Sequence, residues 1–189
     1  MLHGTENTEQ NAERGRSLPI MDPRVDPEPS ADERVTLNGF LDYYRATILS
    51  KIDGLTDDQA RTRFVESDTS LIGIVRHLSE VERSWFRRRL RGEDAPPLYY
   101  SDADPDGDFH PGLDWTVAEA VAAYERECAV SRMIVNDTAS LDELTVGRVT
   151  GYDAPVSLRW ILVHMIEETA RHAGHADILR ELIDGATGD

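Results

Sequence analysis

The amino-acid sequence predicts an all-α protein built as a four-helix bundle. Four long stretches carry apolar residues at steps of three and four, and no stretch shows the alternation of apolar and polar residues typical of a half-buried strand. A chain of 189 residues suits one domain with a sizeable core better than two. Helices with a single apolar face can bury those faces together only by packing as a bundle.

The first 29 residues differ from the rest, and we expect a flexible N-terminal tail there. Residues 1–29 are polar and carry prolines at positions 19, 23, 27 and 29, which exclude a continuous helix. The bundle domain is expected to span residues 30–189. Its first helix is expected to start at a capping box, Ser30 with Glu33, and to end near Gly54.

Three further helices are expected. The first starts near Thr69 or Ser70 and ends before Gly92, the next follows a capping box at Thr116 and ends near Asp137, and the last runs from Ser157 to just before Gly185. The connection at residues 93–115 is long, and such a length permits a crossover between helices in place of a simple hairpin. Long connections in compact domains are often functional.

Charge and composition exclude several classes of partner. Twenty Lys and Arg residues against thirty-six Asp and Glu residues give a formal net charge of −16, so we expect no nucleic-acid or membrane partner. The single cysteine, Cys128, excludes an internal disulfide and a multi-cysteine metal site, and we expect it in the core. Without an apolar segment suited to a membrane span or a signal peptide, a cytoplasmic location is expected.

The last expected helix carries the residues that point to chemistry. His164, Glu168, His172 and His175 fall within an arc of about 80° that overlaps the apolar face. A carboxylate facing the bundle needs a cation, either a side chain or a metal ion, so Glu168 requires such a partner. Because Glu168 and His172 lie one turn apart, their oxygen and nitrogen atoms can approach the same point.

His77 is the candidate third ligand, because it lies at the edge of the apolar face of the second expected helix. Two imidazoles and one carboxylate would leave coordination positions open for water or substrate, and this ligand set favours zinc over magnesium or calcium. A structural role fits the same residues. His77 could be a hydrogen-bonded core histidine, and Glu168 with His172 a helix-stabilising ion pair.

Other residues near these helices carry weaker signals. Aromatic side chains in residues 93–115 could line the mouth of a pocket, whereas His110 is expected to be solvated. The arginines at the end of the second expected helix are expected to be charges in water that complement the helix dipole. The alternative is that one of them binds a carboxylate of a cosubstrate. These arginines are Arg83, Arg87, Arg88, Arg89 and Arg91.

Two segments, residues 70–86 and 160–181, closely resemble the DinB superfamily, specifically its actinobacterial branch of mycothiol-dependent transferases, once called DUF664. The resemblance covers about residues 33–184. It implies a four-helix bundle of DinB type with a long crossover connection. It also implies a divalent metal, zinc or nickel, held by His77, Glu168 and His172.

Many superfamily members have three histidine ligands, and Glu168 here resembles the carboxylate of mycothiol-dependent maleylpyruvate isomerases. His164 and His175 match no ligand position of the family pattern, so we expect them to surround the ligands. The resemblance further implies that a small thiol, mycothiol, binds the metal as a thiolate and adds to a small electrophile.

The expected function is therefore a metal-dependent mycothiol S-transferase or isomerase acting in detoxification or stress response. The expected partners are a small-molecule thiol and an electrophile, and the sequence is also compatible with a homodimer. Two alternatives need the same His77, Glu168 and His172 set. One is a non-catalytic bundle that binds a metal or ligand and acts through a partner, and the other is a metal-dependent hydrolase that uses bound water.

Overall fold

A computed structural model describes residues 24–110, 112, 115–149 and 151–188, and it is helical. Within these residues there is no strand, only isolated bridges between Ser101 and Asp104 and between Leu144 and Ser157. The predicted all-α class is confirmed. The helices are α1 (Glu33–Ile52), α2 (Asp57–Arg61), α3 (Leu71–Glu82), a π-helix η1 (Arg83–Leu90) that continues α3, α4 (Val117–Asp137) and α5 (Leu158–Asp184).

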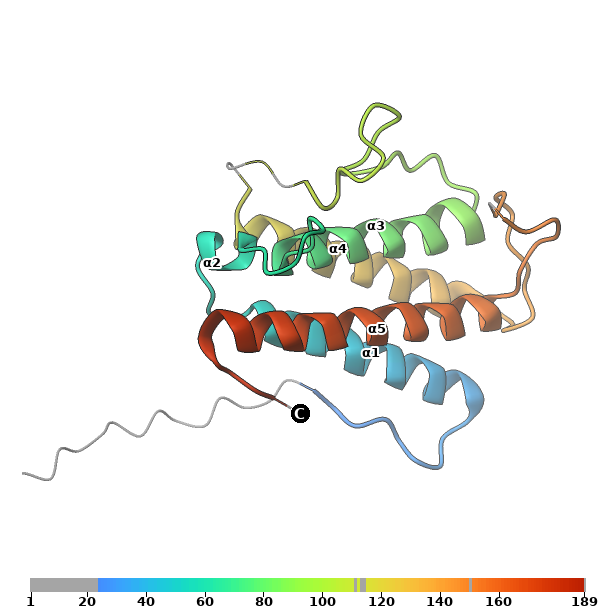
Figure 1. Ribbon diagram of the computed structural model, residues 1–189. Helices are drawn as coiled ribbons and strands as arrows, with labels where there is room; N and C mark the ends of the chain where they lie inside the picture. Colours follow the sequence, from blue (N-terminus) through green and yellow to red (C-terminus); the bar gives the residue numbers. More distant parts are fainter. Residues whose placement is uncertain (1–23, 111, 113–114, 150, 189) are drawn as a thin grey trace, which may run out of the picture.

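The four long helices form a bundle with a crossover, as the resemblance implies (Figure 1). α1 and α3 run in opposite directions, but α4 runs parallel to α3 because the described part of the connection between η1 and α4 returns along the length of the bundle. α5 runs back against α4 and packs chiefly along α1, while α3 packs chiefly against α4 and also contacts α5. The contact between α3 and α5 is the one that builds the site described below.

The start of α1 differs from the prediction. Its N-cap is Asp32, whose side chain accepts a hydrogen bond from the amide of Val35 at 2.9 Å, so the expected capping box at Ser30 is wrong. Glu33 is the first helical residue and its carboxylate pairs with Arg159 on α5 at 2.6 Å, so it does not reach back to a cap. An ion pair between two helices has taken the place of the expected local hydrogen bond of Glu33.

The other helix ends agree with the sequence. Ser70 and Ser157 cap α3 and α5, and Thr116 forms the expected capping box at the start of α4. Gly92 and Gly185 follow η1 and α5 with positive φ angles of 68° and 77°, a conformation that glycine adopts without strain.

A short helix, α2, and an irregular segment, residues 24–29, lie on either side of α1 in the sequence. The sequence analysis missed α2, which is short and is capped by Thr56 and Gln59 in a further capping box. Of the expected tail, residues 1–23 lie outside the described residues. Residues 24–29 run beside α1, where a Cβ added at Gly39 would lie 3.2 Å from the Cβ of Pro27.

Apolar side chains from all four long helices fill the interior. Cys128 is 3% exposed within this core and burial raises the pKa of its thiol, as expected for a core residue and not a reactive one. Arg45 and Glu82 form a buried ion pair at 2.7 Å between α1 and α3. No helix in the described part of the chain combines the length and the apolar character needed to cross a bilayer.

The π-helix η1 gives the end of the second predicted helix an unexpected shape. The amide of Arg91 donates to the carbonyl of Phe86, five residues back, at 3.2 Å. The loop between α4 and α5 caps η1, because the amide of Gly147 donates to the carbonyl of Arg89 at 2.8 Å. A side chain at Gly147 would overlap the carbonyl oxygen of Arg88, so glycine permits this close approach.

Candidate metal centre

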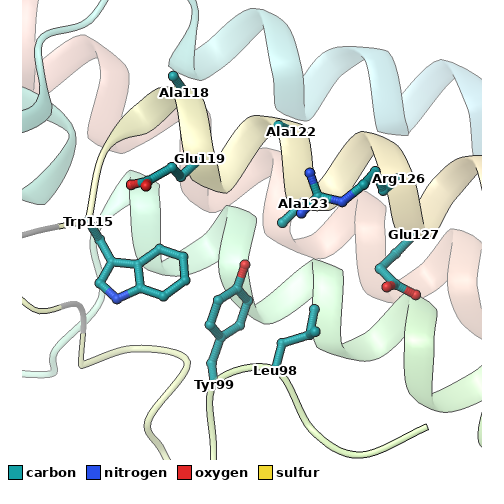
Figure 2. A pocket seen from close by; sticks show the side chains of 9 residues that line it. All are labelled: Leu98, Tyr99, Trp115, Ala118, Glu119, Ala122, Ala123, Arg126 and Glu127. Carbon is teal, nitrogen blue, oxygen red and sulfur yellow. The ribbon is translucent and has the colours of Figure 1, made fainter.

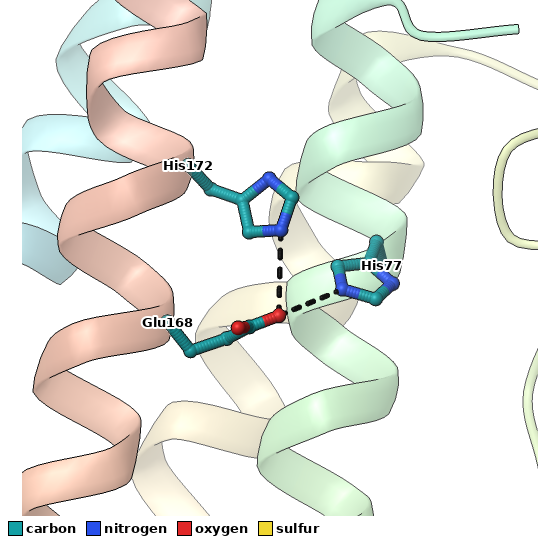
Figure 3. A group of neighbouring side chains, drawn as sticks. All are labelled: His77, Glu168 and His172. Carbon is teal, nitrogen blue, oxygen red and sulfur yellow. Dashed lines mark hydrogen bonds and ion pairs between the residues drawn. The ribbon is translucent and has the colours of Figure 1, made fainter. Parts of the chain in front are cut away.

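Three side chains from two helices converge between α3 and α5 (Figure 3). His77 projects from α3, and Glu168 and His172 project from α5 one turn apart. The Oε1 atom of Glu168 lies 3.2 Å from Nε2 of His77 and 3.4 Å from Nε2 of His172. One ligand atom from each residue can be chosen so that all three lie within 4.8 Å of one another. The structure thus brings together the three candidate ligands.

A buried carboxylate holds His77 from its other side. Oδ2 of Asp108 lies 2.7 Å from Nδ1 of His77, and Asp108 is only 7% exposed. Phe109 stacks on the same imidazole with a ring-centroid distance of 4.9 Å, and Gly73 leaves the space that Phe109 needs against α3. Asp108 and Phe109 therefore fix the ring so that Nε2 faces Glu168.

Sequence reasoning missed Asp108. It lies in the long crossover among several other acidic residues, and nothing in their spacing separates it from them. Only the return of this connection along α3 brings Asp108 to His77. Its neighbour Phe109 was among the aromatic residues expected near a pocket, which was the one available signal.

The electrostatics of the group favour charged forms in the metal-free protein. Burial lowers the pKa of His77, but hydrogen bonds and attraction from Asp108 and Glu168 outweigh burial and raise this pKa to about 9. Hydrogen bonds from His172 and His77 hold the pKa of Glu168 far below its usual range, against the opposing effect of burial. Without a metal ion, the charged imidazole of His77 thus acts as a cationic partner of the kind that a carboxylate in this position requires.

The residues also fit a divalent metal ion. Two imidazole nitrogens and a carboxylate oxygen are a donor set that zinc accepts, and they leave room for a further ligand. Asp108 on Nδ1 of His77 is the kind of outer hydrogen bond that metal-binding histidines make. Nδ1 of His172 is buried and makes no hydrogen bond to any described residue, so Nε2 is the atom of this ring that lies toward Glu168 and a shared ion.

The two other histidines of α5 have different surroundings. The ring of His175 lies 5.3 Å from that of His172, edge to face, and His175 is exposed to solvent. His164 lies between two tryptophans, 4.7 Å from the ring of Trp85 and 5.1 Å from that of Trp160. His175 therefore adjoins a candidate ligand, whereas His164 belongs to an aromatic cluster one turn away.

The aromatic residues of the crossover are divided between two cavities. Tyr99 and Trp115, with ring centroids 5.1 Å apart, line one of about 500 Å³ against α4 (Figure 2). Tyr100 and Phe109 line another of about 290 Å³ that adjoins the candidate metal centre. His110 is exposed and pairs with carboxylates, Asp104 at 2.9 Å and Asp68 at 3.1 Å, as expected for a solvated histidine.

The cavity beside His77 also changes the interpretation of the arginines of η1. Arg88 and Arg89 line this cavity, and only about a fifth of the Arg88 side chain is exposed, at 22%. Arg83 and Arg87 instead form ion pairs, with Glu127 and Glu93 respectively, both at 2.8 Å. The expectation that these groups are simply solvated charges is therefore wrong for these four. The cause is tertiary packing, because Glu127 lies on α4, while Glu93 and the cavity walls Tyr100 and Phe109 belong to the crossover.

Comparisons with known proteins agree with this architecture. A family model described as mycothiol-S-transferase matches residues 36–185. Among solved structures, a conserved protein from Enterococcus faecalis is similar in fold, with a TM-score of 0.62 and 12% sequence identity. That likeness covers 83% of this chain and 100% of the Enterococcus faecalis chain. No curated protein matches the chain. With its helical bundle and the family match over most of its length, the chain belongs to the mycothiol-S-transferase family of DinB-like proteins.

Proposed function

We propose that this protein is a metal-dependent mycothiol S-transferase that acts on a small electrophile in detoxification or stress response, with His77, Glu168 and His172 holding a divalent ion, preferably zinc. The observation that carries the proposal is the convergence of three ligand atoms within 4.8 Å beside a cavity of about 290 Å³. The family supplies the thiol, and the cavity offers a place for the electrophile.

Each residue of the centre has a separate task. Nδ1–H of His77 donates to Asp108, which leaves Nε2 as the atom available to a metal ion. Glu168 contributes the negative charge that two neutral imidazoles lack, and His172 completes the set from the same face of α5. Because ligation requires an unprotonated nitrogen, metal binding must displace the Nε2 proton of His77, whose pKa is raised to about 9 in the metal-free protein.

When bound, a divalent ion supplies Lewis-acid chemistry, which lowers the pKa of a ligating thiol and makes it nucleophilic at neutral pH. With a substrate that carries a leaving group, the sulfur electron pair forms the new C–S bond, and the bond to the leaving group breaks with its electron pair. In an addition to an unsaturated carbonyl compound, the C=C π pair moves to the α-carbon, which takes a proton from solvent. The thiol proton passes to solvent. Phe109 covers His77 and shields this side of the centre from bulk water. The protein needs no cysteine of its own, which agrees with the buried position of Cys128.

The direct test combines metal analysis with a thiol-transfer assay. Purified protein should contain about one zinc ion per chain, and zinc-loaded protein should join mycothiol to members of a panel of alkyl chlorides and α,β-unsaturated carbonyl compounds. His77→Gln and His172→Gln should lose both zinc and transfer. Zinc content that is the same in these variants as in the native protein would overturn the assignment of the ligands.

The same assay separates the alternative functions. Turnover of esters or amides by the zinc-loaded protein without any thiol would indicate a hydrolase in place of a transferase. Zinc bound with full occupancy, but no turnover of the panel with or without mycothiol, would indicate a non-catalytic metal-binding bundle. Glu167→Gln serves as the control, because that side chain is 77% exposed and points away from the centre.

A further inference from the structure

Two consecutive arginines line the cavity beside His77, and a single carboxylate, that of Glu80, lies within ion-pair distance of one of them, Arg88. Nη2 of Arg88 is buried and makes no hydrogen bond to any described residue, and its nearest carboxylate oxygen, on Glu80, lies 3.8 Å away. Nε of Arg89 is likewise buried without a partner, and its Nη1 donates to the hydroxyl of Ser84. The two guanidinium groups thus have one carboxylate near them, and each keeps a buried nitrogen without a hydrogen-bond acceptor among the described residues, which favours the binding of a further anion.

The acidic residues of the cavity only partly balance the charge of the two arginines. Oε1 of Glu80 accepts hydrogen bonds from the backbone amides of Leu98 and Tyr99 in the crossover, while its Oε2 makes no hydrogen bond to any described residue and lies 3.8 Å from Nη2 of Arg88. Asp108 accepts from His77. Asp106 also lines the cavity, but it is an exposed residue at the rim.

Placing two guanidinium groups side by side at a partly buried cavity costs free energy. Burial, together with the neighbouring charge of Arg88, lowers the pKa of Arg89. An anion placed between the two guanidinium groups would relieve this repulsion and satisfy their unpaired N–H groups. Arginine binds carboxylates with paired, parallel hydrogen bonds, which gives orientation as well as affinity.

The walls of the cavity indicate the rest of the ligand. Arg89 lies over the ring of Trp85 at 4.3 Å and Arg88 over that of Tyr100 at 5.6 Å, while Phe109 faces the cavity on the side of His77. Flat aromatic walls favour a flat ligand body. At about 290 Å³, the cavity also suits a small molecule, since drug-sized sites occupy roughly 300–1,000 Å³.

We propose that Arg88 and Arg89 bind the carboxylate of a small planar, unsaturated acid, and that this acid is the electrophile of the adjoining metal centre. That the acid is the electrophile rests on the proposed function, whereas the carboxylate site itself rests on the two arginines alone. The arginines hold the acid at one end of the cavity, and its unsaturated carbons extend toward His77 at the other. Neutral electrophiles of the same shape bind this site more weakly.

The test compares a carboxylate with its neutral amide. Cinnamate and cinnamamide share size and shape, and their affinities for the protein as purified can be measured by titration calorimetry. Native protein should prefer cinnamate by at least tenfold. Arg88→Gln and Arg89→Gln should each lose most of this preference, and Arg88→Lys should keep part of it. Arg87→Gln is the matched control, since Arg87 pairs with Glu93 outside the cavity, and it should retain the full preference.

Several outcomes would overturn the inference. Equal affinities for cinnamate and cinnamamide would do so, as would an equal loss of preference in the Arg87→Gln variant. A preference that survives in both glutamine variants would mean that the metal ion, not the arginines, binds the carboxylate. If N-acetylcysteine is preferred over its amide while cinnamate is not preferred over cinnamamide, the arginines bind a carboxylate on the thiol compound and not one on the electrophile. Circular dichroism of each variant checks the fold. If Arg88→Gln unfolds, the comparison is made with Arg89→Gln and Arg88→Lys.

Failure of this inference can be told apart from failure of the proposed function. Zinc content and mycothiol transfer report on the metal centre, whereas the cinnamate preference reports on the arginines. If zinc is bound and transferred products form without any carboxylate preference, only the inference fails. If the preference is present without zinc or transfer, the carboxylate site stands and the proposed function falls.

Discussion

Asp108 provides a sharp test of the metal centre, because its effect is transmitted through one hydrogen bond to one ring. Asp108→Asn keeps the shape of the side chain and an oxygen that can still accept from Nδ1 of His77, but removes the negative charge. We expect zinc affinity to fall by about 10- to 100-fold, the range typical of lost outer hydrogen-bond partners of metal-binding histidines. This loss corresponds to roughly 1.4–2.7 kcal/mol.

The effect of Asp108 on His77 can also be measured in the metal-free protein, through the pKa of His77. Raising this pKa from 6.5 to about 9 corresponds to about 3 kcal/mol in favour of the charged imidazole, shared between Asp108 and Glu168. Because the folded-state pKa is the higher one, this stabilisation is complete below about pH 6.5 and is lost as the pH rises through 9. Metal-free native protein should therefore be less stable toward urea at pH 9.5 than at pH 6.5, and Asp108→Asn should reduce that difference.

Two measurements decide the matter. Competition with a chromophoric chelator gives the zinc affinity, and NMR titration of the His77 ring protons in metal-free protein gives its pKa. Asp106→Asn is the matched control, since Asp106 lies two residues away in the same crossover but is exposed. If Asp108→Asn binds zinc as tightly as the native protein, or if Asp106→Asn weakens binding equally, Asp108 does not position His77.

Three further substitutions test the centre and the fold around it. Glu168→Gln should lower zinc affinity at least tenfold, by removing the only carboxylate of the ligand set, whereas Glu167→Gln should leave it unchanged; equal affinities would contradict the assignment. Gly147→Ala should destabilise the protein by about 1–3 kcal/mol in urea unfolding, because the new methyl group would overlap the carbonyl of Arg88. Gly174→Ala, on an exposed position of α5 with open space around it, should instead stabilise it by up to about 0.8 kcal/mol, and a loss of stability there would refute the helix argument.

Helix periodicity explains how much of the fold could be predicted. Regular spacing determines which side chains share a face, so the pairing of Glu168 with His172 follows from a separation of four residues. Helix ends that depend on local capping, as at Ser70 and Thr116, were also predicted correctly. The start of α1 was not, because an ion pair between Glu33 and Arg159 joins residues far apart in the chain.

The features that escaped prediction all depend on the path of the crossover. Asp108 reaches His77 only because residues 91–116 return along α3, and no local pattern contains that path. The arginines of η1 illustrate the same limit. Their sequence suggests a solvated, basic helix end, yet the crossover covers two of them and makes them the walls of a cavity.

The candidate metal ligands and the walls of the cavity come from different parts of the fold. The candidate metal ligands come from α3 and α5, which are packed along the bundle, whereas Asp108, Phe109 and Tyr100 come from the crossover. Substitutions in the crossover or in η1 can therefore alter which electrophile enters without moving the ligand atoms, apart from the single contact at Asp108. Loops on a rigid scaffold commonly carry specificity in this way. Substrate preference and metal affinity should thus respond to different substitutions, with Asp108 as the one residue of the crossover that affects both.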